Sequence, residues 1–128
     1  PAEIAKAALE SVAFQTRDLI EAMQEDWGGS VQAVLRIDGG MVANDWAMQT
    51  LANQLGSPVD RPTITETTAA GAAYLAGLAA GLCPKPADFS RQWVLEKRFE
   101  PRHSSEQTDA LYVGWQRAVA RLLHDPKN

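Results

Sequence analysis

The most constraining feature of the sequence is a short apolar run that leads, through two adjacent glycines, into an amphipathic stretch. The run is Ala33–Ile37, the turn is Asp38-Gly39-Gly40, and the amphipathic stretch begins at Val42. The run suits a strand buried on both faces. Glycine adopts positive φ easily and leaves space where a Cβ would otherwise lie, so a flat ligand can approach the backbone. The sequence therefore predicts a strand, a tight turn and a helix start that together can hold a nucleotide.

Two amphipathic helices flank this unit. Apolar residues recur at spacings of three and four over Ile4–Trp27 and over Val42–Leu55, which is the spacing of one helical face. Gly28-Gly29 and Gly56 supply the C-terminal stops. The predicted apolar face of the second helix contains Met48, Leu51, Ala52 and Leu55.

A third helix is predicted after Thr67 or Thr68, either of which can cap it. Its small residues Ala69–Ala73 allow close approach of a neighbouring element. The uncharged stretch Thr67–Cys83 barely reaches membrane-spanning length. We therefore expect a buried helix here rather than a membrane span.

The remaining segments are extended or connecting, apart from a final helix. Val59–Thr65 reads as a short strand in which Pro62 indicates a sheet margin or the approach to a loop. Leu82–Ser90 reads as a surface connection, and the alternation over Trp93–Phe99 predicts an extended piece of undetermined pairing. The last helix begins at Ser104 or Ser105. Its predicted packing stripe consists of Leu111, Trp115, Ala118, Val119 and Leu122.

The order of these elements predicts an α/β fold with a partly parallel sheet and covering helices. Two clear strands are too few for a complete sheet and would leave unpaired edges. Further strands must come from another chain or from sequence outside these 128 residues.

Charge and cysteine content narrow the classes of partner. The chain has a formal net charge of -4, and no cluster of Lys and Arg that could follow a nucleic-acid backbone. No signal peptide is visible at its start. The single cysteine, Cys83, excludes an internal disulfide and indicates a reducing compartment. We expect a cytoplasmic protein that binds neither nucleic acid nor membrane.

The two-glycine turn is the best candidate site, because ligands of open α/β sheets collect beyond the carboxyl ends of strands. It lacks the glycine spacings of phosphate-binding loops and suits a base or ribose better. A plain connector is the alternative reading. Asn44 can bind an adenine edge or cap the helix. Asp38 and Asp45 receive no catalytic role, because no His or Lys accompanies them.

Other polar residues favour ordinary roles. His103 and His124 are far apart in sequence and no Cys accompanies them, so a metal site is not expected. The charged side of the first helix reads as a solvated face, although Arg17 and Asp18 could pair with a neighbouring domain. No nucleophile elbow of a hydrolase occurs.

Three segments carry a resemblance to a known family. They are Glu3–Asp18, Asp38–Asn44 and Thr67–Gly77, and they closely resemble the carbohydrate kinases that include glycerol, xylulose and gluconate kinases. Within that family, Gln15-Thr16-Arg17-Asp18 and Val42-Ala43-Asn44 favour the glycerol kinases. The resemblance covers nearly the whole chain. Pro101–Glu106 departs from the family, which leaves any regulatory contact there in doubt.

The resemblance implies a ribonuclease H-like, actin-like ATPase fold in which two domains close around ATP and substrate. Residues 1–128 would form the C-terminal part of the second domain. In such kinases the second glycine of the turn and the asparagine four residues later contact adenosine, which implies this role for Gly40 and Asn44, with Gly39 beside them.

The resemblance also implies what this chain would not contain. The phosphate loops, the glycerol site, the catalytic aspartate and the ligands of Mg²⁺ would precede Pro1, so these residues alone should not transfer phosphate. The parent enzyme would use ATP, Mg²⁺ and glycerol, pair this segment with its N-terminal actin-like domain, and form a homo-oligomer. A related pentose or sugar-acid kinase and a standalone protein-interaction module are the alternatives.

Overall fold

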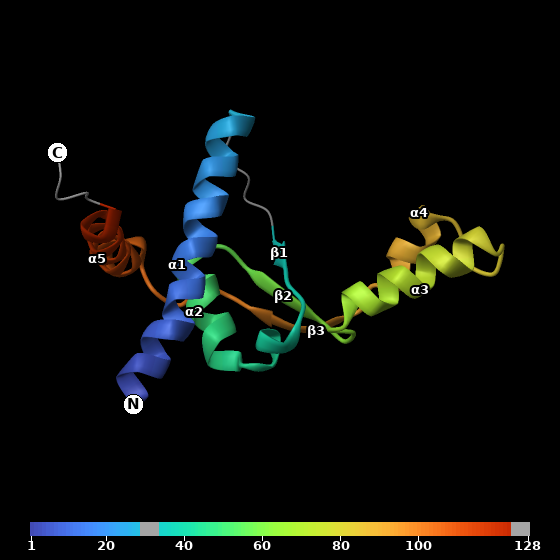
Figure 1. Cartoon of the computed structure of the whole chain (residues 1–128), viewed down its shortest axis with the longest axis horizontal. Helices are drawn as coiled ribbons and strands as arrows, with labels where there is room; N and C mark the ends of the chain where they lie inside the picture. The colour runs from blue at the N-terminus through green and yellow to red at the C-terminus, as the bar shows by residue number, and fades with distance from the viewer. Residues whose placement is uncertain (29–33, 124–128) are drawn as a thin grey trace.

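The computed structural model describes residues 1–28 and 34–123 of the chain (Figure 1). Its elements, in order, are α1 (Ala2–Trp27), β1 (Leu35–Arg36), the 3₁₀ turn η1 (Gly40–Ala43), α2 (Asp45–Leu55), β2 (Val59–Pro62), α3 (Thr67–Ala79), α4 (Pro86–Phe89), the 3₁₀ turn η2 (Ser90–Gln92), β3 (Leu95–Phe99) and α5 (Ser105–Leu123).

The three strands form one mixed sheet with β2 in the centre. β1 runs parallel to β2, with Leu35 opposite Val59, and β3 runs antiparallel to β2, with Phe99 opposite Val59. The predicted α/β fold with a partly parallel sheet is confirmed. β2 is central rather than marginal, and Pro62 ends it at an irregularity in the pairing with β3, where a missing N–H costs least.

The core lies between the sheet and helices α1 and α2. Val59 of β2 and Ala52 of α2 are fully buried, and Met48 and Phe99 pack with them. α1 crosses the outer side of α2 and contributes Ala13 (Figure 1). The predicted apolar face of α2 is therefore confirmed, with Leu55 partly buried at its edge.

The first strand differs from the prediction. It spans only Leu35–Arg36, with Leu35 partly buried and Arg36 exposed, so it is not buried on both faces. The guanidinium of Arg36 instead stacks over the ring of Trp93, 4.2 Å from its centroid. Ala33 and Gly29 lie outside the described residues. Gly28 ends α1 in the left-handed conformation, as the glycine pair predicts.

The predicted burial of the third helix is wrong. No residue of α3 is buried, and Figure 1 shows α3 and α4 extending away from the sheet. We call this segment, Thr67–Phe89, the α3–α4 arm. Glu66 precedes the helix, so Thr67 is its first residue rather than its cap. Within the described residues, no other element covers the small-residue face.

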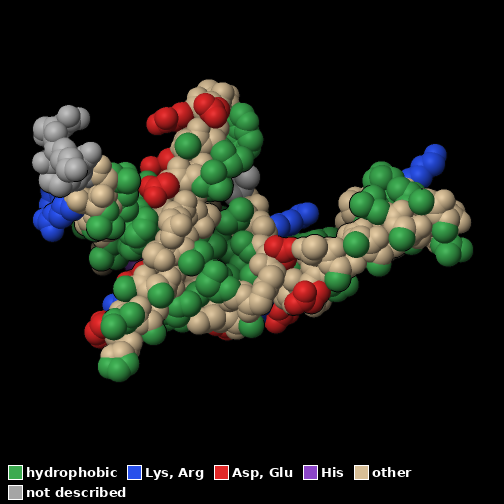
Figure 2. Space-filling model, viewed as in Figure 1, with side chains coloured by type: hydrophobic (Ala, Val, Ile, Leu, Met, Phe, Trp, Pro, Cys, Tyr) green, Lys and Arg blue, Asp and Glu red, His purple; other side chains and the backbone are tan. Residues whose placement is uncertain are grey.

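The arm is held together locally and exposes apolar side chains. The rings of Tyr74 and Phe89 stack with centroids 3.8 Å apart, and the Tyr74 hydroxyl donates to the Pro84 carbonyl at 3.0 Å. Leu75 is 64% exposed. Figure 2 shows hydrophobic side chains along the whole arm. Among the described helices, none combines the length and apolar character needed to cross a membrane.

The contact between α1 and α5 corrects two further predictions. The Asp18 carboxylate accepts hydrogen bonds from the Tyr112 hydroxyl and, at 2.9 Å, from the Trp115 indole N–H. Arg17 donates to Glu21 and to Asp109, both at 2.7 Å. Arg17, Asp18 and Glu21 therefore form an interhelical contact rather than a solvated face.

The packing stripe of α5 is also displaced from the predicted one. Thr108 and Tyr112 are its buried residues, while Leu111 and Leu122 are exposed. Phe14 of α1 stacks against Trp115 with centroids 5.6 Å apart. Burial beside two carboxylates raises the pKa of Tyr112, so its hydroxyl stays protonated and donates. Polar hydrogen bonds and aromatic stacking, rather than an apolar stripe, determine which face of α5 packs against α1.

We expect Val59→Ala to lower the free energy of unfolding of the 128-residue chain by about 2 kcal/mol, because it removes two buried methyl groups and leaves a cavity. Leu75→Ala is the matched control on the exposed arm and should change it by less than about 0.5 kcal/mol. Urea unfolding followed by circular dichroism measures both. Equal losses would show that α3 is buried in solution.

The buried carboxylate of Asp60 gives a pH-dependent contribution. Hydrogen bonds from Arg98 at 2.7 and 2.8 Å hold the pKa of Asp60 below its ordinary value of 3.8. The stabilisation is therefore present above that value and is lost as the pH falls through the folded-state pKa.

We expect Asp60→Asn to be less stable than the wild type at neutral pH, and the difference in unfolding free energy to shrink below a pH of about 3.8. Urea titrations at several pH values test this. Asp88→Asn removes an exposed ion pair and should match the wild type throughout. A difference between Asp60→Asn and wild type that stays constant with pH would contradict the assignment.

Candidate functional site

The two-glycine turn is held by backbone hydrogen bonds to β2 and to the chain that follows it. The amide of Ile37 donates to the Asp60 carbonyl at 3.1 Å, and the amide of Gly39 donates to the Thr65 carbonyl at 2.9 Å. Gly39 has φ 89° and ψ 175°, a conformation that is essentially restricted to glycine. The backbone geometry of the turn therefore requires Gly39.

Neither the backbone conformation nor the packing requires a glycine at position 40. It opens η1, and its φ lies outside the positive region. A Cβ built on Gly40 would meet no atom of the described chain within 4 Å. The residue is exposed and presents bare backbone to the surroundings. The space above it is available to a ligand.

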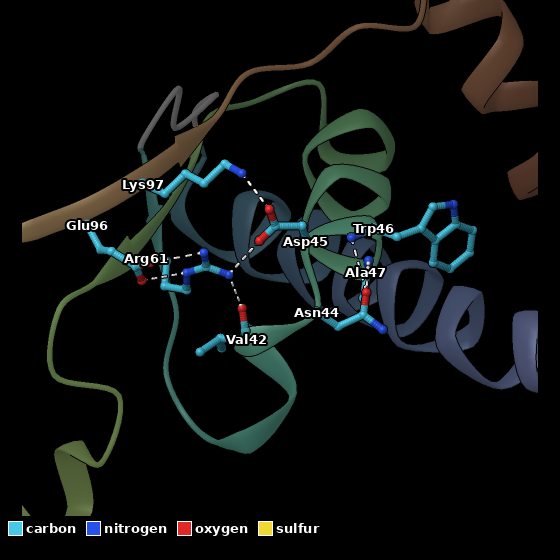
Figure 3. Close-up of polar contacts among 8 residues, drawn as sticks. All are labelled: Val42, Asn44, Asp45, Trp46, Ala47, Arg61, Glu96 and Lys97. Carbon is cyan, nitrogen blue, oxygen red and sulfur yellow. Dashed lines mark hydrogen bonds and ion pairs between the residues drawn. The ribbon is translucent and has the colours of Figure 1, made fainter.

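Asn44 caps α2, which begins at Asp45 rather than at the predicted Val42. Its side-chain oxygen accepts hydrogen bonds from the amides of Trp46 at 3.1 Å and Ala47 at 3.2 Å (Figure 3). Capping satisfies amides that the first helical turn leaves without partners. The side-chain NH₂ group makes no hydrogen bond within the described chain and is a donor for a ligand. Of the two roles foreseen for Asn44, capping is thus observed.

A buried arginine, which the sequence patterns did not single out, lies behind the turn. Arg61 of β2 donates to the Val42 carbonyl at 2.6 Å and to Asp45 at 2.8 Å. Its other nitrogens bind the Glu96 carboxylate at 2.7 and 3.2 Å. Figure 3 shows the guanidinium between these acceptors. The signal was available in the charges of Asp60-Arg61 set against Glu96-Lys97-Arg98.

Asp45 is an anchor and not a candidate base. Hydrogen bonds from Lys97 and then from Arg61 lower the pKa of Asp45. It remains ionised near neutrality and is occupied by two cations, so it has little capacity to accept a proton. The absence of a catalytic role, as expected from the sequence, is compatible with this geometry.

Asp38 is the first residue of the turn but takes no part in this network. It lines a cavity of about 210 Å³ together with Arg36 and Trp93. His103 lies elsewhere, in a cavity of about 350 Å³ between α1, α2 and α5. Over residues 1–28 and 34–123, no three His, Cys, Asp or Glu side chains gather as a possible metal site. His124 lies outside the described residues.

The loop before α5 is tied to α2. The Arg102 amide donates to the Asn53 side chain at 2.8 Å, and Gln49 donates to the Glu100 carbonyl at 2.7 Å. Both contacts lie on the part of α2 beyond its first turn. The predicted departure at Pro101–Glu106 therefore lies away from Gly40 and Asn44.

Comparison with known proteins decides the family. Residues 1–80 match the C-terminal domain of the FGGY family of carbohydrate kinases. This chain belongs to that family. The predicted resemblance is confirmed, and the matched segment contains α1, the two-glycine turn, α2 and β2.

Curated relatives of this chain include glycerol kinases. It is 58% identical over 123 residues to the glycerol kinase of Cereibacter sphaeroides (strain ATCC 17025 / ATH 2.4.3), covering 96% of this chain and 25% of the relative. It is 56% identical over 128 residues to the glycerol kinase of Methylobacterium nodulans, covering 98% of this chain and 26% of the relative. The chain thus spans about a quarter of the length of the curated relatives it matches.

Solved structures of related kinases confirm the fold. The crystal structure of Plasmodium falciparum glycerol kinase with ADP matches with a TM-score of 0.77 and 28% identity, covering 94% of this chain and 24% of that chain. A ligand-bound xylulose kinase from Lactobacillus acidophilus matches with a TM-score of 0.67 and 21% identity, covering 92% of this chain and 24% of that chain. The chain has part of the actin-like ATPase fold of these kinases.

The two glycines of the turn should respond differently to alanine. Gly39→Ala forces a side chain into a glycine-only conformation and should lower the free energy of unfolding by about 1–3 kcal/mol. Gly40→Ala meets open space and should change it by less than about 0.5 kcal/mol. Urea unfolding of the two variants tests the contrast. A large loss for Gly40→Ala would show that packing, and not a ligand, keeps that position free of a side chain.

Proposed function

We propose that this chain is the nucleotide-side, C-terminal part of an ATP:glycerol phosphotransferase, a glycerol kinase that transfers the γ-phosphate of ATP to glycerol. Identities of 55–58% to the glycerol kinases of Cereibacter sphaeroides support this reading. Similarity to a glycerol kinase solved with ADP points to the same nucleotide. Residues 1–128 would belong to the second actin-like domain.

The observation that carries the proposal is the open surface around Gly40 and Asn44. Gly40 offers backbone with no side chain above it, and Asn44 keeps two side-chain N–H donors after its oxygen has capped α2. Adenine ring nitrogens are hydrogen-bond acceptors, and a flat base can lie against bare backbone. Gly40 and Asn44 would contact the adenosine part of ATP, and Gly39 would set the turn.

Chemistry at the phosphates would take place on other parts of the kinase. Phosphoryl transfer requires charge neutralisation at the phosphates, which Mg²⁺ supplies, and a group that orients the acceptor hydroxyl. In the described residues, Asp45 forms ion pairs with Arg61 and Lys97, and Asp38 takes no part in this network. This chain binds and orients the nucleoside, and the ligands of Mg²⁺ and the glycerol site would lie on the rest of the enzyme.

The proposed parent also accounts for the exposed α3–α4 arm. Exposed apolar side chains along one segment, such as Leu75 and Leu82 on the arm, often mark an interaction surface. The rest of the same polypeptide, including an N-terminal actin-like domain, would cover the arm and the free edges of the sheet. A homo-oligomeric parent and a cytoplasmic location stay predictions from the sequence.

A protein-interaction module remains the second candidate, and the exposed arm is the observation in its favour. That reading predicts a partner on the arm and no nucleotide at the turn. A pentose or sugar-acid kinase would share the turn and differ in its acceptor site. Similarity to the xylulose kinase shows the fold alone.

Asn44→Asp tests the turn in the full-length polypeptide that contains this chain. Aspartate caps a helix as well as asparagine does, so α2 should keep its stability. The variant replaces the N–H donors by a carboxylate, so we expect the affinity for ADP to fall at least about tenfold, a loss of about 1.4 kcal/mol. Isothermal titration calorimetry measures it.

Two controls complete this test. Trp46→Phe changes an exposed neighbour without altering the cap and should leave ADP affinity unchanged. Wild-type protein should phosphorylate glycerol in preference to pentoses and sugar acids. Unaltered ADP binding by Asn44→Asp would exclude the adenosine contact, and preference for a pentose or sugar acid would assign a sister kinase.

A further inference from the structure

Arg61 connects three elements around the proposed nucleotide contact. Its side chain is only 9% exposed. From β2 it reaches η1 through the Val42 carbonyl at 2.6 Å and α2 through the Asp45 carboxylate at 2.8 Å. These two acceptors lie on either side of Asn44 in the chain. One guanidinium therefore holds the chain on both sides of Asn44, through a backbone carbonyl before it and a side-chain carboxylate after it (Figure 3).

The orientation of the guanidinium is set from the opposite side. Glu96 of β3 accepts from Nε at 2.7 Å and from the second terminal nitrogen at 3.2 Å, which is a forked contact. The centroid of the Phe99 ring lies 5.4 Å from the guanidinium carbon. A planar fork bound in this way has little freedom to rotate. The remaining nitrogen is thereby directed at Val42 and Asp45.

Sheet stability alone does not require such an arrangement. Burying a charged group is costly, and an apolar side chain of similar volume often stabilises a fold equally well. The side chains of Asp60 and Arg98 form a second forked pair across the same two strands, yet neither side chain hydrogen-bonds to η1 or to α2. Arg61 differs because one of its nitrogens donates hydrogen bonds to η1 and α2 rather than to the neighbouring strand.

We propose that Arg61 is a positioning residue for nucleotide binding, which fixes the backbone on both sides of Asn44 so that the Asn44 amide meets the adenine base. The inference rests on the proposed function of the turn. Binding groups that are held in place before the ligand arrives lose less entropy on binding. A shift of η1 relative to α2 would misplace the Asn44 donors even though the cap itself remained intact.

Kinetics of the full-length kinase test this role. Arg61→Met keeps an unbranched side chain of comparable reach and removes every N–H donor. We expect the KM for ATP to rise by about tenfold, with kcat within about twofold and the KM for glycerol unchanged, because ground-state and transition-state binding of the nucleoside weaken together. Arg61→Lys keeps the charge without the fork and should give an intermediate KM for ATP.

Arg98→Met is the matched control, since it breaks the other forked pair of the same strands. It should destabilise the protein without raising the KM for ATP. Equal increases in Arg61→Met and Arg98→Met would reduce Arg61 to a structural residue and overturn the positioning role. An unchanged KM for ATP in a folded Arg61→Met protein would overturn it as well.

Hydrogen exchange supplies a readout that does not depend on catalysis. The amides of Val42 and Asn44, which donate within η1, should exchange faster in Arg61→Met than in Arg98→Met. If Arg61→Met fails to fold, Glu96→Ala releases the fork at an exposed carboxylate and should raise the KM for ATP in the same direction. No rise in that variant, or unchanged exchange in Arg61→Met, would count against positioning.

The same experiments separate this inference from the proposed function. A wild-type protein that neither binds ADP nor uses ATP would refute the nucleotide site itself, and the positioning role with it. An active wild type whose KM for ATP is insensitive to Arg61 and Glu96 would refute only the positioning role.

Discussion

The described fold depends on β2, a four-residue strand that is buried along its whole length although two of its residues are charged. Asp60 and Arg61 are satisfied by Arg98 and Glu96 of β3, so the cost of desolvating each charge is offset by a forked contact across the strands. This pairing fixes the register of β3. It also places the Arg61 guanidinium next to η1, which connects the sheet to the candidate site.

Periodicity predicted the helices well and their surroundings less well. The extent of α1 and the apolar face of α2 follow from spacing, because a single buried face imposes its period on the sequence. The face of α5 could not be read in this way. Its contact with α1 depends on Tyr112, Trp115 and Asp18, whose partners come from distant sequence and whose polar atoms carry no periodic apolar signal.

The candidate site shows the same division. The backbone freedom of two adjacent glycines predicted the turn. The exposure of Gly40 and the cap formed by Asn44 agree with a surface that can receive a base. Sequence alone could not choose between cap and ligand contact for Asn44. The structure shows that the two roles are compatible, since the amide oxygen caps the helix while the amide nitrogen makes no hydrogen bond within the described chain. The sequence did not predict the role of Arg61, because a charged residue in a short strand is typical of an exposed edge strand. Its buried position becomes clear only from its partners in the fold.

The exposure of α3 is the strongest physical argument that the described residues are only part of a folded unit. The small apolar side chains of a helix rich in Ala and Gly form no favourable interactions with water. They stabilise a fold only when another backbone packs closely against them. The prediction of a buried α3 was wrong because no described element covers its small-residue face, although the helix itself forms at Thr67–Ala79, as its composition predicts. Kinase structures of the same fold are about four times longer than the matched segment, since this chain covers 24% of each. The surface left bare on α3 is thus of the kind that the remainder of such a kinase would cover. The turn at Gly40 is also open, but the charges next to it, Arg61 and Asp45, are already paired within the chain.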